Sequence, residues 1–296
     1  MFSRTSSILI VSKRIAAIPM VVLALSVMLV PMGICQHVPG IKWQKIDTPH
    51  FEIIFPEEIA HEGQRVANMM EHLYAPLGMT LGTDMKRTSW TVLLTNQGVI
   101  DNAEAVLAPR RSPWFSPPDP SGYGPIECYN LYAVHEGRHM AQFDKMNQGL
   151  IRAAWILFGE NGQFSMYGIS IPWWFIEGDA VGIETALTRA GWGRMPAFNM
   201  EIRTLLLSGE RYSYYKANFL SYKDWYPNEY HLGYLFTTHV RREYGADAWS
   251  RILDDACGFS LYTPVFAFSR ALKKHGSLTK SVQISYNYLH KSTYCT

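Results

Sequence analysis

Apolar residues recur along most of the chain at the spacings typical of strands and helices. Residues 50–55 and 89–95 are dense in apolar and β-branched side chains, so each segment predicts a strand. Between them, residues 57–77 place apolar side chains three and four positions apart, which predicts a helix. Residues 103–107 predict a third strand, at the edge of the sheet. We therefore expect a small α/β lobe over residues 40–108.

A proline-rich segment follows this lobe. Residues 109–125 hold six of the chain's 16 prolines, together with Trp114, Phe115 and Tyr123. Because proline lacks a backbone donor and clashes inside helices, the segment predicts neither a helix nor a central strand. Two interpretations stay open: an ordered surface loop, or the rim of a cleft.

The remainder of the chain predicts mostly helices. Residues 127–146 predict a helix, and 150–158 predict a short apolar helix followed by an irregular, glycine-containing stretch over 159–171. Pro172 suits the first position of the next helix, and Gly191 suits the residue just past its end. Further helices are expected over 197–208, 229–244, 246–257 and 263–274.

The N-terminus differs from the rest of the chain. Arg4, Lys13 and Arg14 precede an unbroken apolar run over residues 15–34. This pattern predicts a signal peptide over residues 1–35, cut before Gln36, and an exported domain over 36–296 in the periplasm or secreted. The run is also long enough to stay as a membrane anchor, which leaves membrane association through this segment as an alternative.

Charge and cysteine content exclude two classes of function. The chain has 27 basic and 25 acidic residues, and loss of Arg4, Lys13 and Arg14 with the expected signal peptide leaves 24 against 25, so there is no basic excess for nucleic acid. The four cysteines show no C-x-x-C spacing, which excludes a cysteine zinc site, and they allow at most one disulfide once Cys35 is removed. The aromatic content of 14% fits either a large core or a cleft lined with Trp and Tyr.

The sequence His135-Glu136-Gly137-Arg138-His139 carries the main chemical signal. On a helix, positions i and i+4 share one face, so both histidines can reach one metal ion. Glu136 is turned about 100° from His135 and can serve as a general base at the open side of the metal. Gly137 costs about 1 kcal/mol inside a helix, which is tolerable where something must approach the backbone closely.

A second helix offers the third ligand. Glu177 lies among apolar residues, where a carboxylate is costly unless it is paired or bound to metal. Glu184 follows seven residues later and faces the same way, so it can accept a hydrogen bond from a ligand histidine, or serve as an ordinary salt-bridged surface residue. Two histidines and one carboxylate leave a fourth zinc position for water, which is typical of catalytic Zn²⁺ sites.

Together these motifs resemble the gluzincin zinc metallopeptidases of clan MA, which include the aminopeptidase N group. The likeness is closer to exported bacterial peptidase MA-like domains, and it spans residues 45–275. The matching patterns are H-E-x-x-H-x-x-Q, P-x-W-F-x-E-G-x-A and Y-x-x-G-x-x-F, carried by His135, Glu136, His139, Gln142, Pro172, Trp174, Phe175, Glu177, Gly178, Ala180, Tyr230, Gly233 and Phe236.

The resemblance implies an α+β, two-lobed zincin fold: a mixed-sheet lobe with the active-site helix, then a helical lobe. It implies that Tyr230 donates a hydrogen bond to the oxyanion, with Tyr226 and His231 as fallbacks. Asn102-Ala103-Glu104-Ala105 does not match the G-A-M-E-N loop of true aminopeptidases, and Gly137-Arg138 replaces the usual bulkier pair.

We therefore expect a zinc-dependent metallopeptidase that acts on a peptide or protein substrate. His135, His139 and Glu177 are the expected ligands, Glu136 is the expected base, and the late tyrosines supply a hydrogen-bond donor. The alternative is a zinc-binding or peptide-binding module that cleaves nothing.

Overall fold

The chain forms two compact units, Met1–Ile41 and Lys42–Thr296. The expected signal peptide, residues 1–35, lies outside the described residues. No helix in the described part of the chain has the length and apolar content needed to cross a membrane. The computed structural model describes residues 37–86, 89–98, 101–115, 126–209, 214–219, 221–258 and 264–275.

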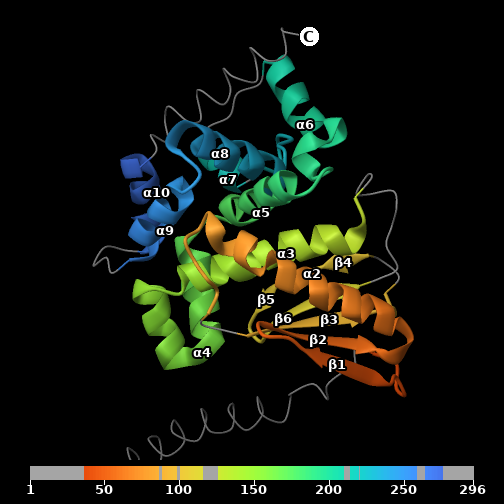
Figure 1. The fold of residues 1–296 in the computed structure, drawn as a ribbon. Coiled ribbons are helices and arrows are strands. Elements are labelled where there is room, and N and C mark those ends of the chain that lie inside the picture. The colour runs from red at the N-terminus through yellow and green to blue at the C-terminus, as the bar shows by residue number, and fades with distance from the viewer. Residues whose placement is uncertain are drawn as a thin grey trace, which may run out of the picture. The chain divides into compact units, whose positions relative to one another are not determined.

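The strands of the second unit form one six-stranded mixed sheet in the order β1-β2-β3-β6-β4, with β5 also paired to β6 (Figure 1). β2 runs parallel to β3, and β3 runs parallel to β6. β1, β4 and β5 add antiparallel pairs. The strands are β1 (Trp43–Asp47), β2 (Phe51–Pro56), β3 (Trp90–Thr95), β4 (Asn102–Ala103), β5 (Val106–Leu107) and β6 (Arg110–Phe115).

The two main strand predictions are confirmed as β2 and β3, whereas the exclusion of a central strand from 109–125 was wrong. β6 pairs on both sides although it contains Pro113. Pro113 lies opposite the interruption between β4 and β5, so no ladder donor is required there. Its carbonyl still accepts a hydrogen bond from the Glu104 N–H, at 3.2 Å.

Two helices cover one face of this sheet (Figure 1). α2 (Ala60–Met79) follows a 3₁₀ turn, η1 (Glu57–Ile59), and packs on β2 and on α3 (Cys128–Met146). Trp90 of β3 stacks on Phe143 of α3 with ring centroids 6.0 Å apart. In α3 every residue except Asn130 is buried, so the helix is enclosed on all sides and both histidines lie inside the fold.

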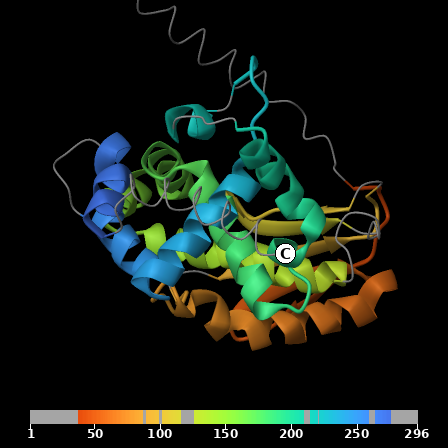
Figure 2. The ribbon, with the colours of Figure 1, turned by 90° about the horizontal axis from the view of Figure 1, so that it is seen from above.

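The remaining helices follow α3 in the sequence. Those from α5 onward lie beyond α3 from the sheet (Figures 1 and 2). They are α4 (Gly149–Ser170), α5 (Trp173–Leu187), α6 (Pro196–Leu207), α7 (Tyr214–Phe219), α8 (Glu229–Tyr244), α9 (Ala248–Cys257) and α10 (Pro264–His275), with a 3₁₀ turn η2 (Trp192–Arg194). Strands early and helices late agree with the expected α+β class.

α4 corrects one expectation. Residues 159–171 do not form an irregular stretch, because the helix resumes directly after Gly159 and runs to Ser170. Gly159 takes φ +65°, which permits a sharp kink at little steric cost. The segment that connects the two motif helices is therefore a kinked helix.

The two described cysteines remain unpaired. Cys128 and Cys257 are buried free thiols, and burial raises the pKa of each to about 12. Cys35 and Cys295 lie outside the described residues.

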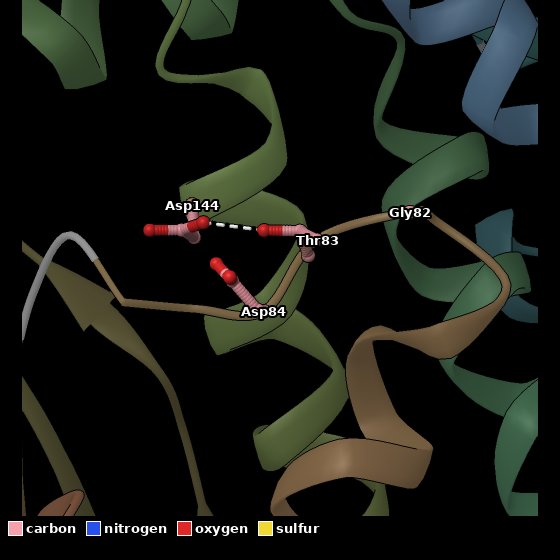
Figure 3. Close-up of a pocket in the computed structure, with 4 residues that line it drawn as sticks. All are labelled: Gly82, Thr83, Asp84 and Asp144. Carbon is pink, nitrogen blue, oxygen red and sulfur yellow. Dashed lines mark hydrogen bonds between the residues drawn. The ribbon is translucent and has the colours of Figure 1, made fainter.

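A small hollow of about 330 Å³ lies where the turn after α2 meets the C-terminal part of α3 (Figure 3). The Thr83 hydroxyl donates a hydrogen bond to the Asp144 carboxylate across it. Gly82 and Asp84 complete its lining. This contact ties the turn to α3.

Candidate metal centre

The start of α3 is set by a side-chain cap. The Glu127 carboxylate accepts hydrogen bonds from the backbone N–H groups of Tyr129 and Asn130, at 3.2 and 3.1 Å. A carboxylate at this position also suits the positive end of the helix dipole. Arg65 of α2 binds the same carboxylate at 2.7 Å. The cap fixes the first turn of the helix that carries the H-E-x-x-H residues.

α5 approaches α3 and supplies the second carboxylate. Pro172 is the N-cap residue, with φ −73° and ψ 141°, rather than the first helical residue as expected, so the helix begins at Trp173. A Cβ on Gly178 would lie 1.9 Å from the backbone carbonyl carbon of Gly233 in α8. Only glycine allows this approach, so Gly178 lets α8 pack directly against the helix turn that carries Glu177.

The structure brings His135, His139 and Glu177 together. One ligand atom from each lies within 4.8 Å of the others, and all three side chains are buried. The Glu177 carboxylate oxygen Oε2 is 3.3 Å from Nε2 of His135 and 3.5 Å from Nε2 of His139. Two imidazole nitrogens and one carboxylate oxygen around one point form a donor set that suits a divalent transition metal, Zn²⁺ among them.

Each histidine is also held through its other ring nitrogen. Nδ1 of His135 is 2.9 Å from Glu184, and Nδ1 of His139 is 2.9 Å from the Gln142 side-chain oxygen. An acceptor at Nδ1 favours the proton of a neutral imidazole at that atom, which would leave the Nε2 lone pair for a metal bound between the imidazoles and Glu177. This tautomer is the one that a metal needs, so the residues present fit a bound metal ion.

Glu177 and the two histidines shift the pKa values of one another. Burial alone raises the pKa of Glu177, but His139 and His135 outweigh it and hold that pKa well below its ordinary value. Burial lowers the pKa of His139, but Glu177 more than compensates, so that pKa is raised. The carboxylate thus stays ionised beside the two imidazoles.

A pocket of about 290 Å³ opens onto these residues. Glu136 lines it together with the triad, and burial raises the pKa of its carboxyl group. A carboxylate with a raised pKa is a better proton acceptor near neutral pH than an exposed one. The other lining residues are Asn102, Ala103, Glu104, Ala105, Phe143, Trp173, Ile176 and Tyr230.

Among the late tyrosines whose side chains the structure describes, Tyr230 lines the pocket. Its ring lies 6.1 Å from that of His135, centroid to centroid. Burial, and then the nearby Glu177, raise the pKa of its hydroxyl, which therefore stays protonated and able to donate. Neither fallback lines the pocket. His231 instead stacks on Phe198, with ring centroids 4.3 Å apart.

Some lining residues were not expected from the sequence. Residues 102–105 form one wall, although they do not match the aminopeptidase loop. The segment 109–125, interpreted from the sequence as either a surface loop or a cleft rim, contributes β6 (Arg110–Phe115) to the sheet, and its residues 116–125 lie outside the described part. Trp173, next to the motif residue Trp174, has 53% of its surface exposed. An apolar run in the sequence does not reveal which of its residues are exposed.

Searches against known protein families and against curated protein sequences give no match. The interpretation of the site therefore depends on the geometry described above.

Proposed function

We propose that this protein is a zinc-dependent metallopeptidase of gluzincin type, with its site between the two lobes of a zincin fold. The observation that carries the proposal is the convergence of His135, His139 and Glu177 beside Glu136 in one pocket. The acceptors at both Nδ1 atoms support it, because histidines held in this way are typical of metal ligands.

The triad, Glu136 and Tyr230 divide the steps of peptide hydrolysis among them in this proposal. A zinc ion on the triad would activate a water molecule near neutral pH and polarise a carbonyl oxygen. Glu136 accepts the proton of the attacking water and then delivers it to the leaving amine. The Tyr230 hydroxyl donates a hydrogen bond to the negative oxygen that develops on the former carbonyl.

The pocket walls favour a peptide as the substrate. Phe143, Trp173 and Ile176 offer an apolar surface for a side chain. Asn102 and Ala103 lie beside it and form β4, a strand at the edge of the sheet. Backbone of this kind can hydrogen-bond to an extended peptide.

Two substitutions test this proposal. We expect purified protein to hold about one zinc per chain, and His139→Ala to lose that zinc. Glu136→Gln should keep zinc and lose hydrolysis of a peptide library. Metal content by elemental analysis and cleavage by mass spectrometry are the measurements. Full zinc retention in His139→Ala would contradict the ligand assignment, and unchanged cleavage by Glu136→Gln would contradict the base.

The Gly137-Arg138 pair, which departs from the family pattern, bears on the non-catalytic alternative. Both residues have a structural role: a Cβ on Gly137 would lie 2.4 Å from Leu77, and Arg138 is fully buried against Asp179. The pair therefore gives no support to a loss of activity. A zinc-bound protein that cleaves no peptide in the same assay would support the alternative.

A further inference from the structure

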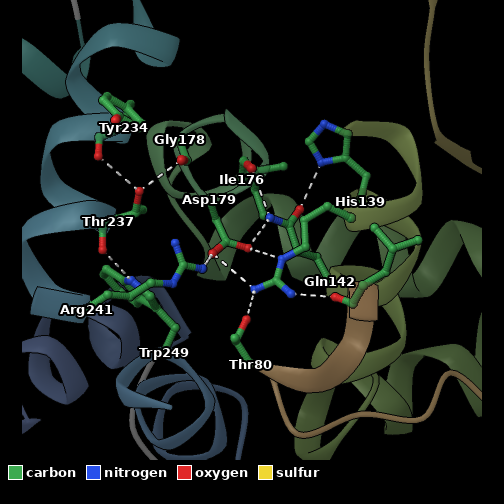
Figure 4. Close-up of polar contacts among 12 residues, drawn as sticks. Thr80, His139, Gln142, Ile176, Gly178, Asp179, Tyr234, Thr237, Arg241 and Trp249 are labelled. Carbon is green, nitrogen blue, oxygen red and sulfur yellow. Dashed lines mark hydrogen bonds and ion pairs between the residues drawn. The ribbon is translucent and has the colours of Figure 1, made fainter. Parts of the chain in front are cut away.

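A buried polar network extends from His139 into the surrounding helices (Figure 4). Gln142, one turn after His139 on α3, contacts both that histidine and Asp179 of α5. Asp179 in turn binds Arg138 of α3 and Arg241 of α8. Gln142, Asp179 and Arg138 are fully buried. None of these three side chains lines the pocket, so they do not contact a substrate there.

The orientation of the Gln142 amide is dictated by its partners. Its nitrogen donates to the Ile176 carbonyl and to the Asp179 carboxylate, both at 2.9 Å. An amide nitrogen has two hydrogens, and two acceptors use both of them. A flipped amide would point its oxygen at two acceptors, which is repulsive. The oxygen must therefore face His139, where only a protonated Nδ1 satisfies it.

Asp179 has no free bonding capacity. One carboxylate oxygen accepts from Nε of Arg138 at 2.6 Å and from Gln142. The other accepts from Nη2 of Arg138 at 3.2 Å and from Arg241. Four donors fill the four acceptor positions of a carboxylate. The guanidinium of Arg138 is itself anchored to α2 by the Leu77 carbonyl and the Thr80 hydroxyl.

We infer that Asp179 is a positioning residue for the metal ligand His139, acting through Gln142. The inference rests on the proposed metal site and extends it to Asp179, which occupies a position that the quoted motifs leave unspecified. Asp179, immobilised by two arginines, fixes the Gln142 amide; the amide fixes the proton of His139 on Nδ1; and Nε2 is then available to the metal. His135 needs no such relay, because Glu184 contacts it directly.

Gln142→Met tests the first link, with Gln163→Met as the matched control. Gln163 is also a buried glutamine, and its side-chain amide donates to the Phe143 carbonyl at 2.9 Å without touching either histidine. We expect Gln142→Met to weaken zinc binding by about 10- to 100-fold. Gln163→Met should bind zinc as the wild type does. Competition with a chromogenic chelator measures both affinities, and the absorption of the cobalt-substituted protein reports the ligand geometry.

Asp179→Asn, alone and combined with Gln142→Met, tests the second link. If Asp179 acts through Gln142, its substitution weakens zinc binding in the wild type and adds nothing in Gln142→Met. Additive losses would overturn the inference, as would wild-type zinc affinity in Gln142→Met. Should Asp179→Asn fail to fold, Arg241→Met replaces it in the same cycle, because the Arg241 side chain reaches the protein surface.

Activity and zinc affinity separate this inference from the proposed function. A wild type that binds zinc but cleaves no peptide removes the peptidase proposal, while the affinities of the variants still decide the role of Asp179. A wild type that binds no zinc overturns both. A wild type that binds zinc and cleaves peptide, with Gln142→Met of equal affinity, overturns the inference alone.

Discussion

At the scale of single residues, Glu184 shows how fully the polar groups behind the pocket are used. One of its carboxylate oxygens meets His135 at 2.9 Å, and the other accepts the Trp192 backbone N–H at 2.8 Å. The side chain has no exposed surface. An ordinary salt-bridged surface residue, the other interpretation of the sequence, is therefore wrong. Buried charge of this kind is tolerated because each oxygen has a donor.

Tyr230 gives the residue-scale prediction. Tyr230→Phe should lower kcat by about 100- to 1000-fold, because one hydrogen bond to the developing oxyanion is lost. KM and zinc content should change little, since the ring remains in place. Steady-state kinetics on a peptide substrate provide the measurement. Tyr226→Phe is the comparison and should keep near wild-type kcat, because Tyr226 does not line the pocket. An equal loss in both variants would contradict the assignment.

At the scale of elements, the contact between α5 and α8 decides where Glu177 and Tyr230 lie relative to each other. The helices meet at Gly178 and Gly233, backbone against backbone. Thr237 of α8 donates to the Gly178 carbonyl at 2.9 Å, and Trp249 of α9 donates to the Thr237 carbonyl at 3.0 Å (Figure 4). The chain thus uses small residues for the approach and polar ones for the register.

Gly178→Ala tests this contact. The new methyl group would meet backbone that cannot rotate away, so we expect a loss of about 3 kcal/mol in the free energy of unfolding. Chemical denaturation of the metal-free protein measures it. Gly168→Ala is the matched control: it adds the same methyl group within α4, where nothing lies within 4 Å. That control should be neutral or stabilising by up to about 1 kcal/mol. Equal stability of the two variants would contradict the packing argument.

Predictability from the sequence also differs between elements. The H-E-x-x-H spacing was enough to predict that His135 and His139 lie on one face of a helix, because helical periodicity is a local property of the sequence. The bonds of Gln142 and Asp179 could not be predicted, since they depend on how α3, α5 and α8 pack. The prediction that 109–125 holds no central strand was wrong because Pro113 is tolerated in β6 opposite the break between β4 and β5. The prediction of an irregular stretch over 159–171 was wrong because a helix can resume beyond a glycine kink.

At the scale of the whole second unit, one charge cluster joins four helices. Asp179 of α5 binds Arg138 of α3 and Arg241 of α8, and Arg138 reaches the C-terminal end of α2. Burial alone would raise the pKa of Asp179, but the two arginines outweigh it and hold that pKa well below its ordinary value. Part of the stability of the fold therefore depends on this carboxylate being ionised.

The pH dependence of unfolding tests this coupling. The folded-state pKa of Asp179 is lower than the unfolded value of about 3.9. The stabilisation is therefore complete above that unfolded value and is lost as the pH falls toward the folded one. We expect the unfolding free energy of the metal-free wild type to fall more steeply below about pH 5 than that of Asp179→Asn. At neutral pH that variant should already lack about 3–5 kcal/mol. Denaturant titrations over this pH range measure both. Parallel pH profiles would contradict the coupling.

The enclosure of α3 has a consequence for the order in which the molecule opens. A helix covered by the sheet, by α2 and by α5 exchanges its amide hydrogens only when those layers separate. We therefore expect α3 to belong to the cooperative unit that is most protected from hydrogen exchange. The two histidines then stay in place for as long as this unit remains folded. A metal bound at the proposed site would leave and return through the pocket while the ligand helix stays folded, so the backbone would not need to refold before each binding event.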